Sequence, residues 1–134
     1  MAYIAPLPSA PVVLSRETFE VLSLVDLTAS AHRLLHLFLA RFDPDFGTVN
    51  LSQRDMGELL ALSHPSVNKA VGALERAKLA WQIDDALYQL HPVLTDGKMA
   101  DRLAVVPEIV VSDPKSLREI RRQRYSRQTE SLPA

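Results

Sequence analysis

Two histidines stand at a spacing that could hold a metal ion. His32 and His36 are four residues apart in a stretch with helical periodicity, so both rings would lie on one helix face. The residues between them are Arg-Leu-Leu, so no glutamate stands ready as a general base, and no third ligand is evident. We therefore expect surface or interface histidines, with no metal site and no cofactor.

Other catalytic chemistry has little support in the sequence. The chain contains no cysteine, which excludes a disulfide scaffold, a thiolate metal site and a cysteine nucleophile. It has only four glycines and no glycine-rich phosphate loop. Tyr88 and Tyr125 could attack a DNA strand, but no His-x-His metal pair accompanies either, and Tyr88 is better explained as a core residue. We expect a protein that is not an enzyme.

Residues 51–76 have the pattern of two short helices joined by a tight turn. Ser52 can cap the first helix, with Asp55 at the capping-box position. Ser63 can cap the second, and Pro65 in its first turn loses no hydrogen bond. The expected inward residues are Met56, Leu59 and Leu60 in the first helix and Val67, Val71 and Leu74 in the second. A second helix of this kind can lie in the major groove of DNA.

A short hairpin is expected immediately after these helices. Residues 80–83 and 87–90 are rich in aromatic and β-branched side chains, and Asp84-Asp85-Ala86 between them is a turn sequence. Trp81 and Ile83 would share one face of the hairpin. A helix pair followed by such a hairpin is the winged arrangement. The alternative is a helix pair and hairpin of the same shape that binds no DNA.

Length and patterning indicate one domain with extensions. The 134 residues are 47% apolar, with no membrane-length apolar run and no signal peptide, so we expect a cytoplasmic protein. We divide the chain into an N-terminal arm and possible strand (1–27), a winged domain (28–92) and a C-terminal extension (93–134). Around residues 19–22 a helix from Arg16 is the alternative to the strand. Thr28 should cap a helix to about residue 42, and residues 43–50, with a proline and a glycine, should form a loop. Residues 105–111 could form a strand or a buried connection.

Positive charge is concentrated near the C-terminus. The formal net charge is −1, but residues 115–127 contain six basic side chains and one acid, Glu119. Asp113-Pro114 would start a helix there, presenting Arg118, Arg121, Arg122 and Arg124. Local charge of this kind suits phosphate contact. A solvated helix face or a disordered tail is the alternative.

The sequence resembles the winged helix-turn-helix family. Residues 51–70 are similar to the pattern of MarR-like and Crp/Fnr-like regulators, with Gly57 in place of alanine and Ala61 in place of glycine. A looser resemblance, over about residues 19–98, is to RepL-like winged-helix proteins that initiate plasmid replication. It includes the lead helix before residue 42 and the ending Tyr88-Gln89-Leu90-His91-Pro92. The resemblance implies a mostly α fold with a small β-wing.

The resemblance also implies where DNA would bind. The start and outer face of the second helix would contact bases, with Asn68 suited to adenine and Lys69 to guanine or phosphate. The full set of expected DNA contacts is Ser52, Gln53, Ser63, His64, Ser66, Asn68, Lys69, Arg76, Arg118, Arg121, Arg122 and Arg124. We expect a sequence-specific double-stranded DNA-binding protein, a transcription regulator or a replication initiator, that acts as a homodimer. The alternative is a winged-helix module that binds protein, which the acidic wing tip favours.

Overall fold

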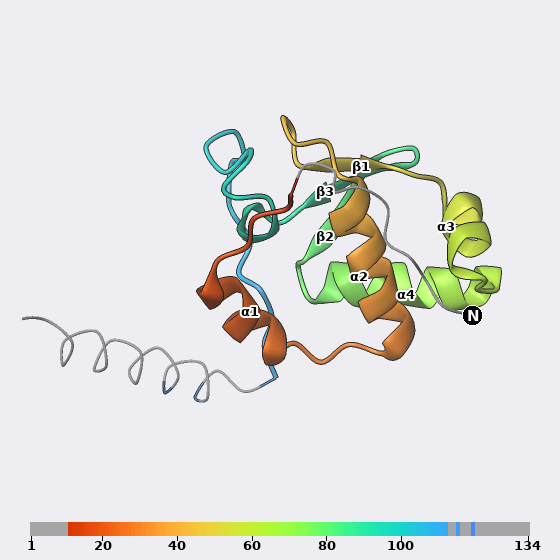
Figure 1. Cartoon of the computed structure of the whole chain (residues 1–134), viewed down its shortest axis with the longest axis horizontal. Helices are drawn as coiled ribbons and strands as arrows, with labels where there is room; N and C mark the ends of the chain where they lie inside the picture. Colours follow the sequence, from red (N-terminus) through yellow and green to blue (C-terminus); the bar gives the residue numbers. More distant parts are fainter. Residues whose placement is uncertain (1–10, 113–114, 116–118, 120–134) are drawn as a thin grey trace, which may run out of the picture.

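The computed structural model describes residues 11–112, 115 and 119. This part of the chain contains four α-helices, one 3-10 turn and a three-stranded antiparallel sheet (Figure 1). The helices are α1 (Arg16–Ser23), α2 (Ala29–Arg41), α3 (Gln53–Leu60) and α4 (His64–Arg76). The strands are β1 (Thr48–Asn50), β2 (Ala80–Asp84) and β3 (Leu87–Leu90), and the 3-10 turn is η1 (Pro92–Leu94). The mixture of helices and sheet is compatible with a winged-helix-like α+β fold.

A serine or threonine side chain begins each of these helices. Ser15, Thr28, Ser52 and Ser63 have extended backbones, and their hydroxyl oxygens each accept a backbone N–H from three residues further on, at 3.1–3.3 Å. Each bond satisfies a donor that has no partner within its helix. The caps expected at Thr28, Ser52 and Ser63 are confirmed.

The stretch that could have been a strand is helix α1. Thr18 and Val21 are buried, whereas Phe19 is 58% exposed, which is helical spacing and not the alternation of a strand. The helix from Arg16, the alternative to the strand, is therefore the observed structure. α1 lies beside the C-terminal part of the described chain, away from the sheet (Figure 1).

The sheet has one strand more than the expected hairpin. β3 is the central strand, with β2 on one side and β1 on the other, and Val49 of β1 faces Tyr88 of β3. We expected a loop at residues 43–50, so β1 is a correction. Its three residues gain their strand geometry from pairing with β3, a partner almost 40 positions away in the chain.

The core lies between α2, α4 and the sheet. Leu34, Phe38, Leu74 and Tyr88 are at most 2% exposed, and the rings of Phe38 and Tyr88 are 5.5 Å apart. Met56, Val67 and Val71 are buried as expected, but Leu59 is 49% exposed, which corrects its inward assignment. The core also includes Val25 and Leu94, so it extends past both bounds of the expected winged domain.

Residues 105–112 cross back over the fold as a connection without a strand. Ile109 and Val111 pack against the core, while Val105 and Val110 are exposed. The Val110 N–H donates to the carbonyl of Ala77, and the N–H of Ser112 donates to that of Leu24. The helix expected from Asp113 lies outside the described residues, except that Lys115 and Glu119 are helical. Among the described helices, none has the length and apolar character needed to cross a membrane.

Candidate nucleic-acid interface

A three-residue turn joins α3 to α4, and its geometry explains the glycine at residue 57 but not the alanine at residue 61. Ala61 ends α3 in the left-handed conformation (φ 53°, ψ 45°), where glycine is the usual residue. The chain then returns so closely that a Cβ on Gly57 would lie 2.9 Å from the carbonyl oxygen of Leu62. Leu62 N–H donates to the carbonyl of Gly57 at 3.0 Å. Glycine is needed at the point of close approach, and alanine carries the strained dihedral angles.

Helix α4 packs against α2, α3 and β2. Its buried residues are Val67, Ala70, Val71 and Leu74. Arg33 of α2 donates from Nη2 to the carbonyl of Leu60 at 2.6 Å, which joins the end of α3 to α2. The carboxylate of Glu75 accepts the backbone N–H of Gln82 at 3.3 Å and joins α4 to β2. These contacts fix the direction in which the remaining face of α4 points.

The outward side of α4 is polar and available. His64, Asn68 and Lys69 are exposed, and no hydrogen bond or ion pair joins their side chains to another of the described residues. Ser66 is half-buried, and its hydroxyl accepts from Ser63 at 2.9 Å. An amide, an ammonium and an imidazole thus stand on one rigid helix with free donors and acceptors.

Arg76 lies against its own helix. A Cβ on Gly72 would be 3.1 Å from its Nη1, so the guanidinium covers the space where a side chain is missing. Arg76 also lines a depression with Asp26, Thr28 and Ser112. It therefore stands at the edge of the α4 surface, beside the described end of the C-terminal connection.

The remaining expected contacts divide into positioning residues and residues beyond the described chain. Ser52 is engaged as the cap of α3, and Gln53 reaches the hydroxyl of Tyr88 from Nε2 at 3.5 Å. Ser52 therefore stabilises the start of α3, and Gln53 helps to position α3 against the sheet. The four arginines expected on the C-terminal helix lie outside the described residues: Arg118, Arg121, Arg122 and Arg124.

The electrostatic balance of this region is close to neutral. Two cations near the helix pair were not among the expected contacts: Arg54, which pairs with Glu58 at 3.4 Å, and Lys78, which follows α4 with φ 65°. Asp84 and Asp85 are exposed at the wing tip. Residues 11–112 contain nine Lys or Arg against thirteen Asp or Glu. Steering of DNA by this part of the chain would therefore be weak.

The histidine pair of α2 is engaged in a different way. His36 donates from Nδ1 to the carbonyl of His32 at 2.6 Å, a bond within the helix. Both side chains are exposed. Among residues 11–112, 115 and 119, no three His, Cys, Asp or Glu side chains are grouped so that they could hold a metal ion.

Comparison with known proteins found no match: no family model, no curated protein and no solved structure matches this chain.

Proposed function

We propose that this protein binds double-stranded DNA in a sequence-specific manner and acts as a binding protein, not as an enzyme. The process it serves is transcription regulation or the start of plasmid or mobile-element replication. The observation that carries the proposal is the outward side of α4, where His64, Asn68 and Lys69 are exposed on a helix anchored by its other face. A rigid helix with unengaged polar groups is what readout in the major groove requires.

The chemistry of these residues suits base edges. An asparagine amide can donate to N7 of adenine and accept from its N6 amino group, and a lysine can reach guanine or a phosphate. Ser63 and the first turn of α4 present backbone N–H groups near which a phosphate is stabilised. These groups lie at the same end of α4 as His64, so one approach of the duplex could use both kinds of contact.

The direct test is titration of labelled duplexes from the DNA flanking the protein's own gene, against random duplex. Asn68→Ala and Lys69→Ala should each weaken specific binding by about 1–3 kcal/mol, because each removes one base contact. Lys98→Ala removes an exposed lysine that lies outside α4 and is the matched control. If both α4 variants bind the cognate duplex as tightly as the control, α4 is not the reading element.

The C-terminal basic segment is proposed to add affinity without sequence preference, because phosphate contacts carry no base identity. A chain ending at Asp113 should bind specific and random duplexes more weakly. The slope of log K against log salt should also fall by about 0.9 for each phosphate that the shortened chain no longer neutralises. A truncated protein that keeps the full salt slope would place these arginines against solvent or another protein.

We also propose that the DNA-binding form is a symmetric homodimer, because one such domain covers little DNA and two half-sites need two copies. The exposed apolar residues Val12, Val13, Val105 and Val110, near the two ends of the described chain, support this.

A second candidate function, protein binding without DNA, is favoured by the wing. There the exposed acids Asp84 and Asp85 adjoin Ile83, which is 49% exposed. Failure to bind any duplex at low salt would favour this second function.

A further inference from the structure

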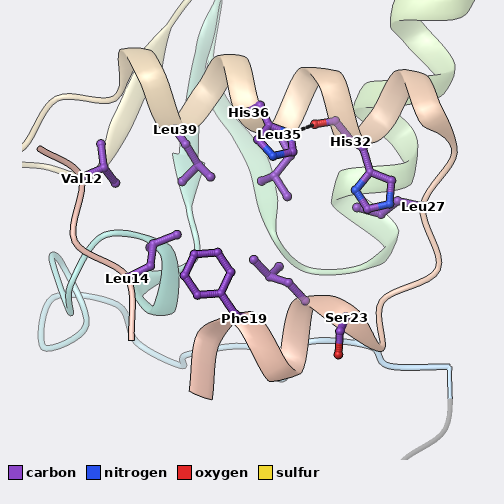
Figure 2. Close-up of a pocket in the computed structure, with 10 residues that line it drawn as sticks. Val12, Leu14, Phe19, Ser23, Leu27, His32, Leu35, His36 and Leu39 are labelled. Carbon is purple, nitrogen blue, oxygen red and sulfur yellow. Dashed lines mark hydrogen bonds between the residues drawn. The ribbon is translucent and has the colours of Figure 1, made fainter. Parts of the chain in front are cut away.

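An apolar groove separates α1 and the chain that precedes it from α2. Its volume is about 550 Å³. Figure 2 shows Phe19 and Leu14 on one wall, opposite Leu35 and Leu39 of α2. The complete lining is Val12, Leu14, Phe19, Leu22, Ser23, Leu27, His32, Leu35, His36 and Leu39. None of these residues belongs to α4, so the groove does not include the outward side of α4.

The groove is suited to an uncharged, apolar occupant. No Asp, Glu, Lys or Arg lines it. Phe19 is 58% exposed and Val12 is 45% exposed, so large apolar side chains at its mouth still face water. Covering them with another apolar surface would be favourable, because it removes apolar area from water.

Residues 1–10 have the matching chemistry and begin at the right place. Their sequence, Met-Ala-Tyr-Ile-Ala-Pro-Leu-Pro-Ser-Ala, has no charged side chain and includes Tyr3, Ile4 and Leu7. The described chain starts at Pro11, directly before Val12 at the groove. Ten residues in a polyproline conformation reach about 31 Å. Helix α2 is only about 15 Å long from its first residue, Ala29, to Leu39. Residues 1–10 are therefore long enough to fill the groove.

The prolines favour the groove of a second copy over the segment's own groove. Pro6, Pro8 and Pro11 fix φ and hold the residue before each of them in an extended conformation. From Val12 the chain already passes along its own groove into α1, so residues 1–10 would have to reverse direction to fill it. A proline-stiffened segment resists that reversal. The segment can reach the groove of a neighbouring molecule without reversing its direction.

We propose that residues 1–10 of one copy lie in the α1–α2 groove of a second copy, and that the second copy returns the same contact. The interface is therefore self-complementary, as a two-fold dimer requires. This inference rests on the proposed homodimer, but it does not depend on DNA binding. It assigns a partner to the groove and a role to the uncharged N-terminal segment.

Because the chain has no cysteine, disulfide cross-linking can test the exchange directly. Ile4→Cys and His36→Cys are prepared as separate full-length variants, mixed and oxidised. A disulfide-linked pair made of one variant of each kind is expected. Lys98→Cys, at an exposed site outside the groove, replaces His36→Cys as the control and should give markedly less cross-linked product. A chain carrying both Ile4→Cys and His36→Cys reports whether the bond forms within one molecule.

A second measurement uses a matched pair of exposed phenylalanines. Phe19→Asp places a charge in the groove and should shift the protein from dimer to monomer in sedimentation equilibrium. Phe46→Asp changes a phenylalanine that is 49% exposed outside the groove and should leave the dimer intact. Circular dichroism confirms that both variants are folded.

The possible outcomes separate this inference from the proposed function. A cross-link only within a single chain would overturn the exchange, as would a dimer that forms no Ile4–His36 link or survives Phe19→Asp. A dimer of that kind would leave the homodimer standing and move its interface elsewhere. A wild-type protein that is monomeric at tens of micromolar would overturn both the exchange and the homodimer. Duplex titration judges DNA binding separately.

Discussion

Helix α2 faces α4 and the sheet on one side and α1 across a groove on the other, and α4 and α1 are held to the fold in different ways. Towards α4 and the sheet, it buries Leu34 and Phe38 in a continuous apolar core. Towards α1 lies the open groove. Val21 of α1 is buried and Leu22 packs against the core, but the contacts around α1 also include hydrogen bonds to backbone carbonyls. Thr18 Oγ1 donates to Val93, and Ser112 donates to Leu24 from both N–H and Oγ.

This difference separates two kinds of stability. Apolar packing on the α4 side is shared by many side chains, so it is lost only when the whole domain unfolds. We expect the few hydrogen bonds on the α1 side to open without disturbing that core. The surface proposed to read DNA therefore stands on the rigid side. The surface proposed to receive a second copy stands on the side that can adjust.

The largest effect is expected from the core side of this comparison. Leu74→Ala removes a side chain that is 1% exposed and should lower the free energy of unfolding by about 2–5 kcal/mol. Leu59→Ala, in α3 but 49% exposed, is the matched control and should have a much smaller effect. Urea denaturation measures both. Equal decreases in the two variants would show that the α4 side is not the more tightly packed region.

A smaller and more local effect is expected on the α1 side. Thr18 is 1% exposed, and Thr18→Val keeps its shape but leaves the Val93 carbonyl without its 3.1 Å hydrogen bond. The free energy of unfolding should fall by about 1–3 kcal/mol. Ser23→Ala is the control, because that hydroxyl bonds only to Glu20 in its own exposed turn.

Hydrogen exchange tells whether the Thr18 effect is local. The amide of Ser112, which donates to Leu24, should exchange faster in Thr18→Val, while amides in the middle of α4 should be unchanged. Faster exchange throughout α4 would contradict the division of the molecule into two regions.

Local sequence signals predicted the parts of the fold that local interactions determine. The caps at Thr28, Ser52 and Ser63, the span of α2 and the strands at residues 80–83 and 87–90 were expected and are observed, with β2 extended to Asp84. On α4, the inward and outward sides were also separated correctly, because the helix is long enough for its apolar period to be clear.

What the sequence could not predict depends on distant partners. β1 exists because β3 pairs with it, and its three residues carry no periodicity of their own. Leu59 fits an apolar helical face, yet it stays half exposed within the described part of the chain, so tertiary context decided its exposure. The α1–α2 groove could not be predicted either, since it is formed by residues from two elements of which one was left open between strand and helix.

The last and most local effect concerns pH. His91 is 8% exposed; its Nδ1 accepts the N–H of Val93 at 3.0 Å, and its Nε2–H donates to the carbonyl of Pro107 at 2.7 Å. The ring must be neutral to accept at Nδ1. It thereby joins η1 to the C-terminal connection, on the same side of the fold as α1.

Burial lowers the pKa of His91, and the hydrogen bond to Pro107 only partly opposes this. The unfolded chain, with a pKa near the ordinary value of about 6.5, then binds the proton more readily than the folded one. The stability that His91 contributes is therefore complete above the unfolded pKa, and it is lost as the pH falls below about 6.5 towards the lower folded pKa. Thermal unfolding of the wild type between pH 7.5 and pH 5 should show this loss, and His91→Gln should reduce it. His64→Gln, which changes an exposed histidine on α4, should keep the wild-type profile. If His91→Gln retained the full loss of stability in acid, the connection between η1 and Pro107 would not be the pH-sensitive part of the molecule.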